Sequence, residues 1–295
     1  MKMDVLDEIH ATELERFAEA RRLAAIELAA AKAEEKARKA AKTAGLKQQP
    51  MPGLPLNYSL EGLNCEGQLP PAKVVSAIRK FRSRKCVEID APRMSFLLSG
   101  VPGTGKTAFA RYVAHQVGMR MITAQASDIL SCYHGETERR IARAFAEARK
   151  LDAILFLDEI DGLLPDRRFA SQSFEITQTN QLLQSMESFE GVLIGATNLV
   201  ENLDEAVMRR FTYKLKLSYL TDLGKSIFFQ RYFKTPLTEA QKQRLDALDR
   251  LTPGDFRTVK EGLYYLEDKQ NNDARIDALE AECAAKGLVR ARIGF

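Results

Sequence analysis

One short stretch of the sequence combines residue types that can bind phosphate. Residues 100–107 follow the spacing G-x-x-x-x-G-K-[ST] of a phosphate-binding loop, here called the P-loop: Gly100, Val101, Pro102, Gly103, Thr104, Gly105, Lys106 and Thr107. The loop amides and the start of the following helix direct partial positive charge at an anion. Lys106 can reach the β- and γ-phosphates as a point charge, and the Thr107 hydroxyl can ligate Mg²⁺. The stretch predicts a site for ATP and Mg²⁺.

Two acids, Asp158 and Glu159, directly follow the apolar run 153–157. A carboxylate at the position of Asp158 can hold Mg²⁺, and Glu159 can orient and polarise an attacking water as a general base. The alternative is an ordinary strand that ends in a solvated acidic turn. The P-loop about 50 residues upstream favours the catalytic interpretation.

Three more side chains have types suited to phosphate chemistry. Asn198 ends the apolar segment 191–198, where its amide can bond both a γ-phosphate and the lytic water; otherwise it caps a loop. Arg209 and Arg210 are adjacent, and guanidinium groups recognise phosphate oxygens while staying charged. An arginine supplied to a neighbouring subunit's γ-phosphate raises the rate by about 10³ to 10⁵. The alternative is a surface basic pair.

The elements that must position these residues alternate along the sequence between about 92 and 218. Short apolar runs predict strands at 95–99, 119–122, 153–157, 191–196 and 213–217, and helical patterns cover 107–117, 136–150 and 174–187. Such alternation predicts an α/β fold in which helices cover both faces of a five-stranded parallel sheet, an αβα sandwich. Ligands bind such sheets at the carboxyl ends of the strands, where every motif above falls.

The rest of the chain has a different composition. Residues 1–48 predict a charged, Ala-rich helical extension, 49–70 a Pro- and Gly-rich linker, 71–218 the core, which begins with a helix at 71–81, and 219–295 a helical lid domain. The predicted lid helices are 223–233, 238–248, 254–266 and 274–285. Three roles stay open for the extension: a charged helix folded on the body, a coiled-coil or partner-binding arm, or a nucleic-acid arm, which its balanced charge disfavours.

Bulk composition narrows the class of protein. The 295 residues carry a net charge of +4, which does not by itself indicate nucleic acid. Four scattered cysteines without a C-x-x-C pair predict reduced thiols in a cytoplasmic protein. No apolar run approaches the length of a membrane span, and the charged N-terminus does not resemble a signal peptide, so we expect no membrane partner.

Over roughly residues 94–260 the sequence resembles the AAA ATPases of the AAA+ superfamily. The likeness rests on the P-loop, on 158–163, on 196–198 and on 203–211, where Arg-Arg-Phe is similar to the spastin/katanin-like members. The resemblance implies that Lys106 and Thr107 bind ATP and Mg²⁺, that Asp158 and Glu159 are the Walker B pair, and that Asn198 is sensor 1. It also implies that Arg209 and Arg210 complete the site of a neighbour in a homo-oligomeric ring, expected to be a hexamer.

Two further segments acquire a meaning from this resemblance. Residues 127–138 resemble the first pore loop, in which an aromatic at the position of Tyr133 grips an unfolded polypeptide; His134 departs from the aliphatic residue common there. The run Gly-Asp-Phe-Arg at 254–257 resembles sensor 2 of broader AAA+ proteins, although the narrower AAA clade usually has a small residue in place of Arg257. Nucleotide contact and a helix-surface arginine are therefore both open for Arg257.

The sequence supports one function over two others. The first is an ATPase that remodels, unfolds or disassembles protein substrates. The alternative is an AAA+ ATPase that acts on nucleic acid or as a regulatory switch in a transposition or defence system, which lysines or arginines on the pore loop would favour; residues 132–138 have none. An inactive ATP-binding scaffold is disfavoured because Lys106, Glu159, Asn198 and Arg209 are all present.

Overall fold

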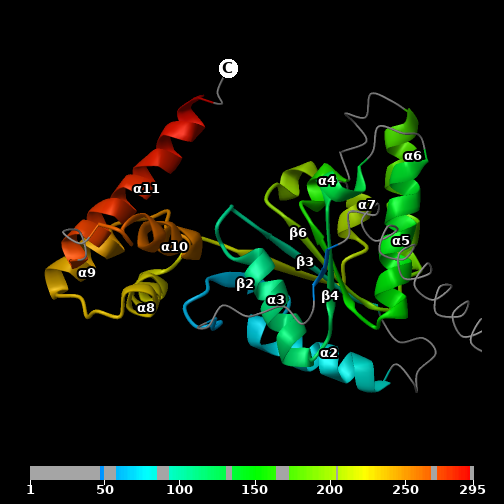
Figure 1. Ribbon diagram of the computed structural model, residues 1–295, viewed down its shortest axis with the longest axis horizontal. Coiled ribbons are helices and arrows are strands. Elements are labelled where there is room, and N and C mark those ends of the chain that lie inside the picture. Colours follow the sequence, from blue (N-terminus) through cyan, green and yellow to red (C-terminus); the bar gives the residue numbers. More distant parts are fainter. Residues whose placement is uncertain are drawn as a thin grey trace, which may run out of the picture. The chain divides into compact units, whose positions relative to one another are not determined.

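A seven-stranded sheet runs through the centre of the fold, in the order β1-β4-β5-β6-β3-β7-β2 (Figure 1). The strands are β1 Lys47–Gln49, β2 Cys65–Gly67, β3 Met94–Gly100, β4 Met121–Gln125, β5 Ile154–Asp158, β6 Val192–Thr197 and β7 Tyr213–Leu217. The five strands from β4 to β7 in this order are parallel, which confirms the predicted parallel sheet. The outer two, β1 and β2, pair antiparallel with β4 and β7.

This computed structural model describes residues 47–49, 58–84, 93–130, 135–163, 173–203, 205–266 and 271–292. All of them belong to one compact unit, residues 47–295. The predicted helical extension 1–48 lies outside the described residues except for its last two. Tyr133 and His134 of the predicted pore loop also lie outside them.

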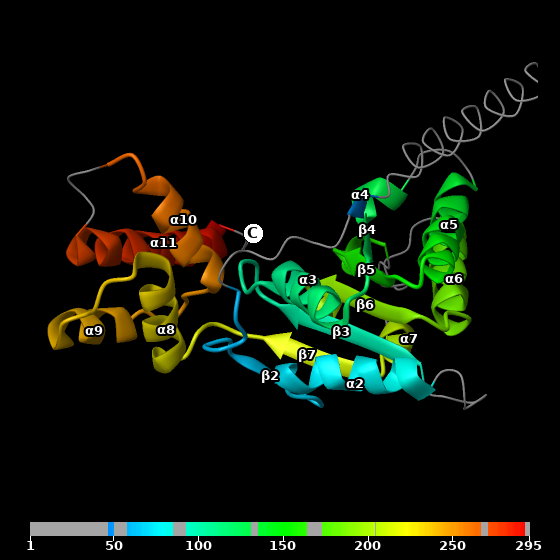
Figure 2. The same ribbon diagram turned by 60° about the horizontal axis from the view of Figure 1, so that its bottom comes forward.

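The central strands are buried on both faces, as parallel strands covered by helices must be. In β3 six of the seven residues are buried. Alternate side chains of a strand point to opposite faces, so Phe96 and Leu98 pack with helices α2 (Pro71–Arg84) and α3 (Lys106–Val117). Helices α5 (Glu136–Lys150) and α6 (Ser173–Glu187) lie on the other face, where Phe145 contacts Phe189 edge-on (Figures 1 and 2). This confirms the αβα arrangement.

The two edge strands are absent from the sequence-based prediction. Strand β2 lies inside 49–70, the stretch predicted as a linker, and Tyr58, Leu60 and Leu69 of that stretch pack against the core. Both edge strands are three residues long, too short for an alternating pattern to stand out in the sequence. The linker composition therefore does not prevent this stretch from contributing to the sheet.

Strand β4 also differs from its prediction, 119–122, by starting at Met121 and continuing to Gln125. Gly118, with a φ of 68°, ends α3 in the left-handed conformation, so Met119 belongs to the turn that follows. The ladder with β5 then continues as far as Gln125 opposite Asp158. Hydrogen-bond pairing, which the apolar pattern does not report, sets these bounds.

After β7 the regular elements of the described residues are four helices: α8 Asp222–Phe233, α9 Glu239–Asp246, α10 Pro253–Gly262 and α11 Asn272–Arg292. Their buried residues form a second hydrophobic cluster, which includes Phe228, Phe229, Phe256 and Ile276. Thr238 and Gln241 form a capping box at the start of α9. Helix α10 ends before the predicted 266, and α11 is longer than predicted. We call α8 to α11 the C-terminal helices; the domain boundaries 1–48, 49–70, 71–218 and 219–295 stay predictions.

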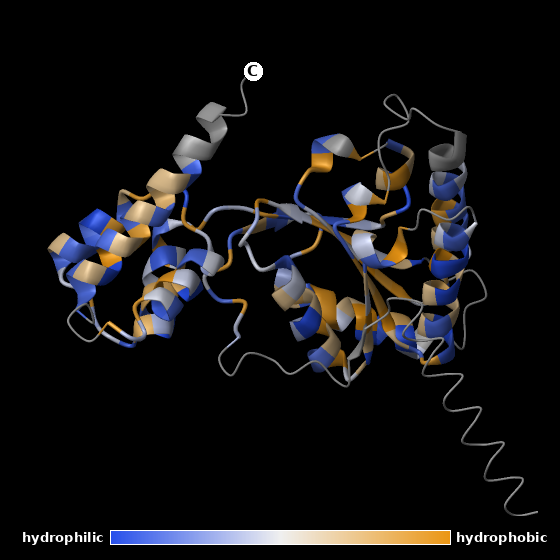
Figure 3. Cartoon of the chain, turned by 45° about the horizontal axis from the view of Figure 1, so that its top comes forward, coloured by the Kyte–Doolittle hydropathy of each residue, from blue (hydrophilic) through white to orange (hydrophobic). Residues whose placement is uncertain are grey.

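The remaining short elements connect the strands. They are α4 Ala126–Ile129, η1 Ile160–Gly162, η3 Val200–Asn202 and α7 Glu205–Met208. Figure 3 shows hydrophobic colouring on strands in the middle of the sheet, whereas the helices carry both colours, as amphipathic helices around a buried sheet do. None of the helices in the described ranges is long and apolar enough to cross a bilayer.

Candidate nucleotide-binding site

The P-loop connects the end of β3 to the start of α3. Gly103 and Gly105 have φ angles of 83° and 92°, a region that glycine enters without the steric cost of a side chain. Gly105 is the residue that precedes α3, so the loop leads directly onto the amides of the first helical turn. The Thr104 hydroxyl donates to the Val101 carbonyl at 2.9 Å and fixes the loop internally. This backbone is a cradle for an anion.

Lys106 folds back over the P-loop. Its Nζ donates to the carbonyls of Gly100 at 2.7 Å and Val101 at 3.1 Å, and the residue is buried. Burial lowers the pKa of the Lys106 ammonium, while the charges of Asp158 and Asp161 oppose that shift. A phosphate oxygen beside this ammonium would favour the charged form and so raise the pKa again.

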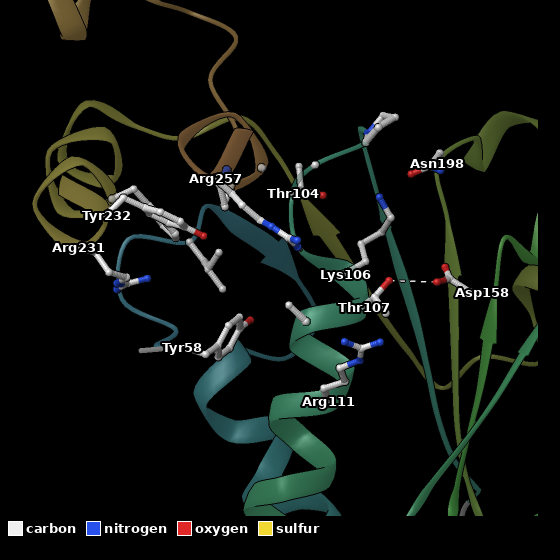
Figure 4. A pocket seen from close by; sticks show the side chains of 18 of the residues that line it. Tyr58, Thr104, Lys106, Thr107, Arg111, Asp158, Asn198, Arg231, Tyr232 and Arg257 are labelled. Carbon is white, nitrogen blue, oxygen red and sulfur yellow. Dashed lines mark hydrogen bonds between the residues drawn. The ribbon is translucent and has the colours of Figure 1, made fainter. Parts of the chain in front are cut away.

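The two predicted acids lie at the end of β5, which is two strands away from β3 in the sheet: Asp158 is the last residue of the strand and Glu159 follows it. The Thr107 hydroxyl donates to Asp158 Oδ2 at 3.0 Å, the contact dashed in Figure 4. Glu159 is exposed and has a φ of 54°, left-handed backbone that is uncommon for a residue with a side chain. Strained backbone of this kind is concentrated at functional sites. The structure thus brings both acids to the P-loop edge of the sheet.

Asn198 follows β6, the strand between β5 and β3. The turn around it is fixed because Thr197 Oγ1 donates to Asp161 Oδ1 at 2.6 Å and accepts from the Leu199 amide at 3.0 Å. Asn198 lines the same cavity as the P-loop and the two acids. The three predicted motifs at the ends of β3, β5 and β6 therefore meet at one place.

The cavity has a volume of about 790 Å³. Besides the residues already described, it is lined by side chains that the sequence analysis did not select: Tyr58, Leu63, Arg111, Phe228, Arg231, Tyr232 and Lys260. Two of their buried polar atoms, Tyr58 Oη and Arg111 Nε, have no hydrogen-bond partner among the described residues. Burial raises the pKa of the Tyr58 phenol, which keeps it protonated and able to donate.

This set of groups fits a nucleoside triphosphate with Mg²⁺. Cationic groups and loop amides suit the phosphates, and aromatic faces together with unpaired polar atoms suit a base and sugar. The Thr107 hydroxyl and the Asp158 carboxylate are hard oxygen ligands of the kind Mg²⁺ prefers. The site chemistry agrees with the ATP and Mg²⁺ expected from the sequence.

Comparison with known proteins identifies the family of this region. Residues 96–219 match the family model described as "ATPase family associated with various cellular activities (AAA)". This part of the chain is an AAA ATPase domain. The predicted resemblance is confirmed, and family membership indicates ATP hydrolysis as the reaction of the domain.

Relatives of the AAA domain come from distant organisms. The chain is 35% identical to Protein SAV of Sulfolobus acidocaldarius over 174 residues, which cover 56% of this chain and 22% of the relative. It is 40% identical to Protein mac-1 of Caenorhabditis elegans over 141 residues, 46% of this chain and 17% of that protein. Spastin of Ixodes scapularis is 33% identical over 171 residues, 56% of this chain and 26% of spastin. The matches thus span about a quarter or less of each of these relatives.

The two predicted finger arginines of the AAA domain do not line the cavity of their own chain, as far as the described residues show. Arg209 follows α7, its side chain is 70% exposed, and it pairs with Glu205 one helical turn earlier. Arg210 is more enclosed: it forms an ion pair with Glu187 of α6 and donates to the Ala206 carbonyl at 3.2 Å. Arg209 and Arg210, although adjacent in the sequence, therefore have different surroundings, which the sequence did not predict.

Arg257, the predicted sensor 2 residue, lines the cavity from α10. Figure 4 shows its guanidinium directed towards the start of α3. It also donates to Glu261 Oε1 at 2.8 Å, and its side chain is 70% exposed. The geometry brings Arg257 to the site, and its contact with nucleotide stays a prediction.

Some of the overlooked lining residues carry signals that the sequence analysis did not use. Arg111 lies four residues after Thr107 on α3, so the helical repeat places both on one face of that helix. Tyr58 lies in the predicted linker, where its packing against Tyr112 was not foreseeable. Arg231 and Tyr232 come from α8, and only the tertiary arrangement brings them to the P-loop.

The P-loop contacts the C-terminal helices directly at Gly103. The Gly254 amide donates to the Gly103 carbonyl at 2.9 Å. A Cβ added to Gly103 would lie 2.6 Å from Thr252 Oγ1, whereas a Cβ on Gly105 would meet no described atom within 4 Å. Gly103 and Gly105 thus have similar positive φ angles, but only a side chain at Gly103 would clash with Thr252.

We expect Gly103→Ala to lower the thermal stability of the nucleotide-free protein more than Gly105→Ala. Both substitutions place a side chain in left-handed backbone at about 1–2 kcal/mol each. Only Gly103→Ala adds a clash of about 1–3 kcal/mol, which corresponds to a further drop in Tm of about 2–10 °C. Thermal denaturation of both variants measures the difference, and equal shifts would contradict the close approach of Gly103 to Thr252.

Proposed function

We propose that this protein is an ATP-hydrolysing AAA ATPase that assembles into a ring, expected to be a hexamer, and remodels, unfolds or disassembles protein substrates. The main support is the meeting of three strand ends at one cavity. The P-loop at the end of β3, the acids at the end of β5 and Asn198 directly after β6 line it together. Each supplies a different part of phosphoryl transfer to water: binding, activation of the nucleophile and its orientation.

The chain's own residues divide the chemistry as follows. The P-loop amides and Lys106 bind the phosphates, and Lys106 leaves its carbonyl partners to do so. The Thr107 hydroxyl and Asp158 would hold Mg²⁺, which neutralises phosphate charge when bound. Glu159 accepts the proton of the attacking water, and Asn198 orients that water against the γ-phosphate. The exposure of Glu159 leaves its carboxylate accessible to water.

A shared active site explains the position of the arginines. Arg209 is exposed and outside the cavity lining of its own chain, as a residue that serves a neighbour must be. An arginine supplied in trans stabilises the charge of the transition state. Ring assembly is then part of the catalytic mechanism. From the family resemblance we also propose that Tyr133 contacts the polypeptide. We propose separately that residues 1–48 recruit substrates and, from the scattered cysteines, that the protein works in the cytoplasm.

Replacement of Lys106 by methionine tests the nucleotide site. The unaltered chain should bind ATP and hydrolyse it in the presence of Mg²⁺, and Lys106→Met should weaken binding by about 10- to 100-fold, because it removes a charge-assisted hydrogen bond. Calorimetric titration with ADP and a phosphate-release assay measure the two effects. Lys73→Met, an exposed lysine of α2, is the matched control and should leave both unchanged. An unaltered chain that neither binds nor hydrolyses ATP would overturn the proposal.

The substrate class needs a separate experiment. A hydrolysis-deficient variant such as Glu159→Gln, immobilised with ATP, should retain substrate that can then be identified. Recovery of protein without nucleic acid would support remodelling of proteins. Recovery of DNA or RNA in its place would favour the alternative, an AAA+ ATPase that acts on nucleic acid.

A further inference from the structure

The turn that contacts the P-loop is itself held by a buried carboxylate. Asp255, the third residue of α10, is 6% exposed, and Thr252 is 1% exposed. Asp255 Oδ2 accepts from the Thr252 amide at 2.7 Å and from the Thr252 hydroxyl at 2.9 Å. These two bonds fix the start of α10, whose Gly254 amide donates to Gly103 in the P-loop.

The same carboxylate oxygen has a third partner from the last described helix. Lys286 of α11 donates from Nζ to Asp255 Oδ2 at 2.5 Å and to the Arg250 carbonyl at 3.0 Å. A buried carboxylate is stable only when its charge is paired and hydrogen-bonded, so removal of Lys286 leaves Asp255 uncompensated. A series of contacts therefore runs from Lys286 of α11 through Asp255 to the turn 252–254, whose Gly254 amide bonds Gly103.

We propose that Asp255 and Lys286 are positioning residues for nucleotide. They hold the turn 252–254 against Gly103 and so keep the P-loop in the conformation that binds phosphate. The proposal rests on the proposed function, because it assumes that the P-loop binds nucleotide. If Lys286 has this role, a change at α11 that displaces it loosens the turn 252–254 and so lowers the affinity for nucleotide.

Arg244 of α9 provides a matched control, because it also forms an ion pair with α11. It joins α9 to α11 through Asp277 at 2.7 Å and Glu280 at 3.0 Å. The side chains of Arg244 and Lys286 are similarly exposed, at 39% and 28%. Replacement of either residue by methionine removes an ion pair that involves α11. The carboxylates that pair with Arg244, those of Asp273, Asp277 and Glu280, all belong to α11, and none of them lies in the turn 252–254. A purely structural effect on α11 should therefore be similar for both variants.

The test compares the Kd for ADP and the Tm of Lys286→Met, Asp255→Asn and Arg244→Met with those of the unaltered chain. Lys286→Met should raise the Kd about tenfold, by analogy with residues that hold a metal ligand in place, whose loss costs about 10- to 100-fold in affinity. Its KM for ATP should rise by the same factor while kcat changes less. Lys286→Arg, which keeps the charge, should restore most of the affinity. Arg244→Met should lower the Tm and leave the Kd within about twofold of the original.

The outcomes separate the two proposals. An unaltered chain without affinity for ADP would overturn the proposed function itself. If the unaltered chain binds ADP and folded Lys286→Met binds it equally well, the positioning role is wrong. Equal losses of affinity in Lys286→Met and Arg244→Met would also overturn it, because they would reflect general loosening of α11. Asp255→Asn serves as the second variant and should weaken ADP binding in the same direction.

Discussion

Glu159→Gln should bind ATP as tightly as the unaltered chain and hydrolyse it about 10² to 10⁴ times more slowly. The amide cannot accept a proton from water, whereas it keeps the length and shape of the carboxylate. Because the variant holds ATP without turnover, rings should accumulate. Phosphate release measures the loss of activity, and mass photometry with and without ATP measures assembly.

The backbone conformation at Glu159 allows the variant and the unaltered chain to be compared without a difference in steric strain. Glutamine has the same β-carbon in the same left-handed conformation, φ 54°, so the steric strain is unchanged and the Tm should stay within a few degrees. A variant that retains hydrolysis at an unaltered Tm would remove Glu159 from the role of general base. A monomeric variant at saturating ATP would contradict the ring.

Arg209→Ala should reduce hydrolysis by about 10³ to 10⁵ and leave nucleotide binding and the Tm nearly unchanged. The reason for the small effect on stability is its exposure: its pair with Glu205 is a surface i,i+4 pair, worth about 0.3–0.5 kcal/mol at most. Arg210→Ala should differ from Arg209→Ala in its effect on stability. It leaves Glu187 without its partner and removes the bond to the Ala206 carbonyl, so it should lower the Tm as well as the activity.

Mixed assemblies test whether Arg209 acts on a neighbour. Arg209→Ala subunits keep an intact P-loop, and Lys106→Met subunits keep an intact Arg209. Together they should recover part of the hydrolysis that neither has alone, because intact halves meet at some interfaces. Mass photometry must confirm that the mixture assembles. An assembled but inactive mixture would contradict a site shared between subunits.

The parts of this fold that could be predicted from sequence are those with a local signal. The parallel strands are recognisable in the sequence as apolar runs. The residues that follow these runs, such as Asp158 and Asn198, lie at the carboxyl ends of the strands, where ligands of open α/β sheets bind. The helix caps also follow from nearby residues, as Thr238 with Gln241 demonstrates. For these features the cause lies within a few residues of the effect.

The parts that could not be predicted depend on contacts between distant segments. Nothing near Gly103 indicates that Gly254 donates to its carbonyl, and nothing near Arg210 indicates its ion pair with Glu187 on α6. The wall of the cavity formed by Tyr58 and Arg231 has the same origin, since the two residues lie far apart in the sequence. Site residues on strand ends are thus foreseeable, whereas those supplied by packing are not.

The short edge strands have a consequence for solubility. An uncovered edge of a sheet presents a row of unpaired amides and carbonyls on which another chain can form a β-ladder, a common start of aggregation. Here β2 pairs with β7 and β1 with β4, and both come from residues that precede the predicted core at 71–218. A fragment cut at residue 71 would keep every P-loop and acidic residue of the site and yet expose both edges. Because β1 and β2 are only three residues long, the edges that they expose in turn are short, which limits edge-to-edge association although these strands carry none of the predicted catalytic groups.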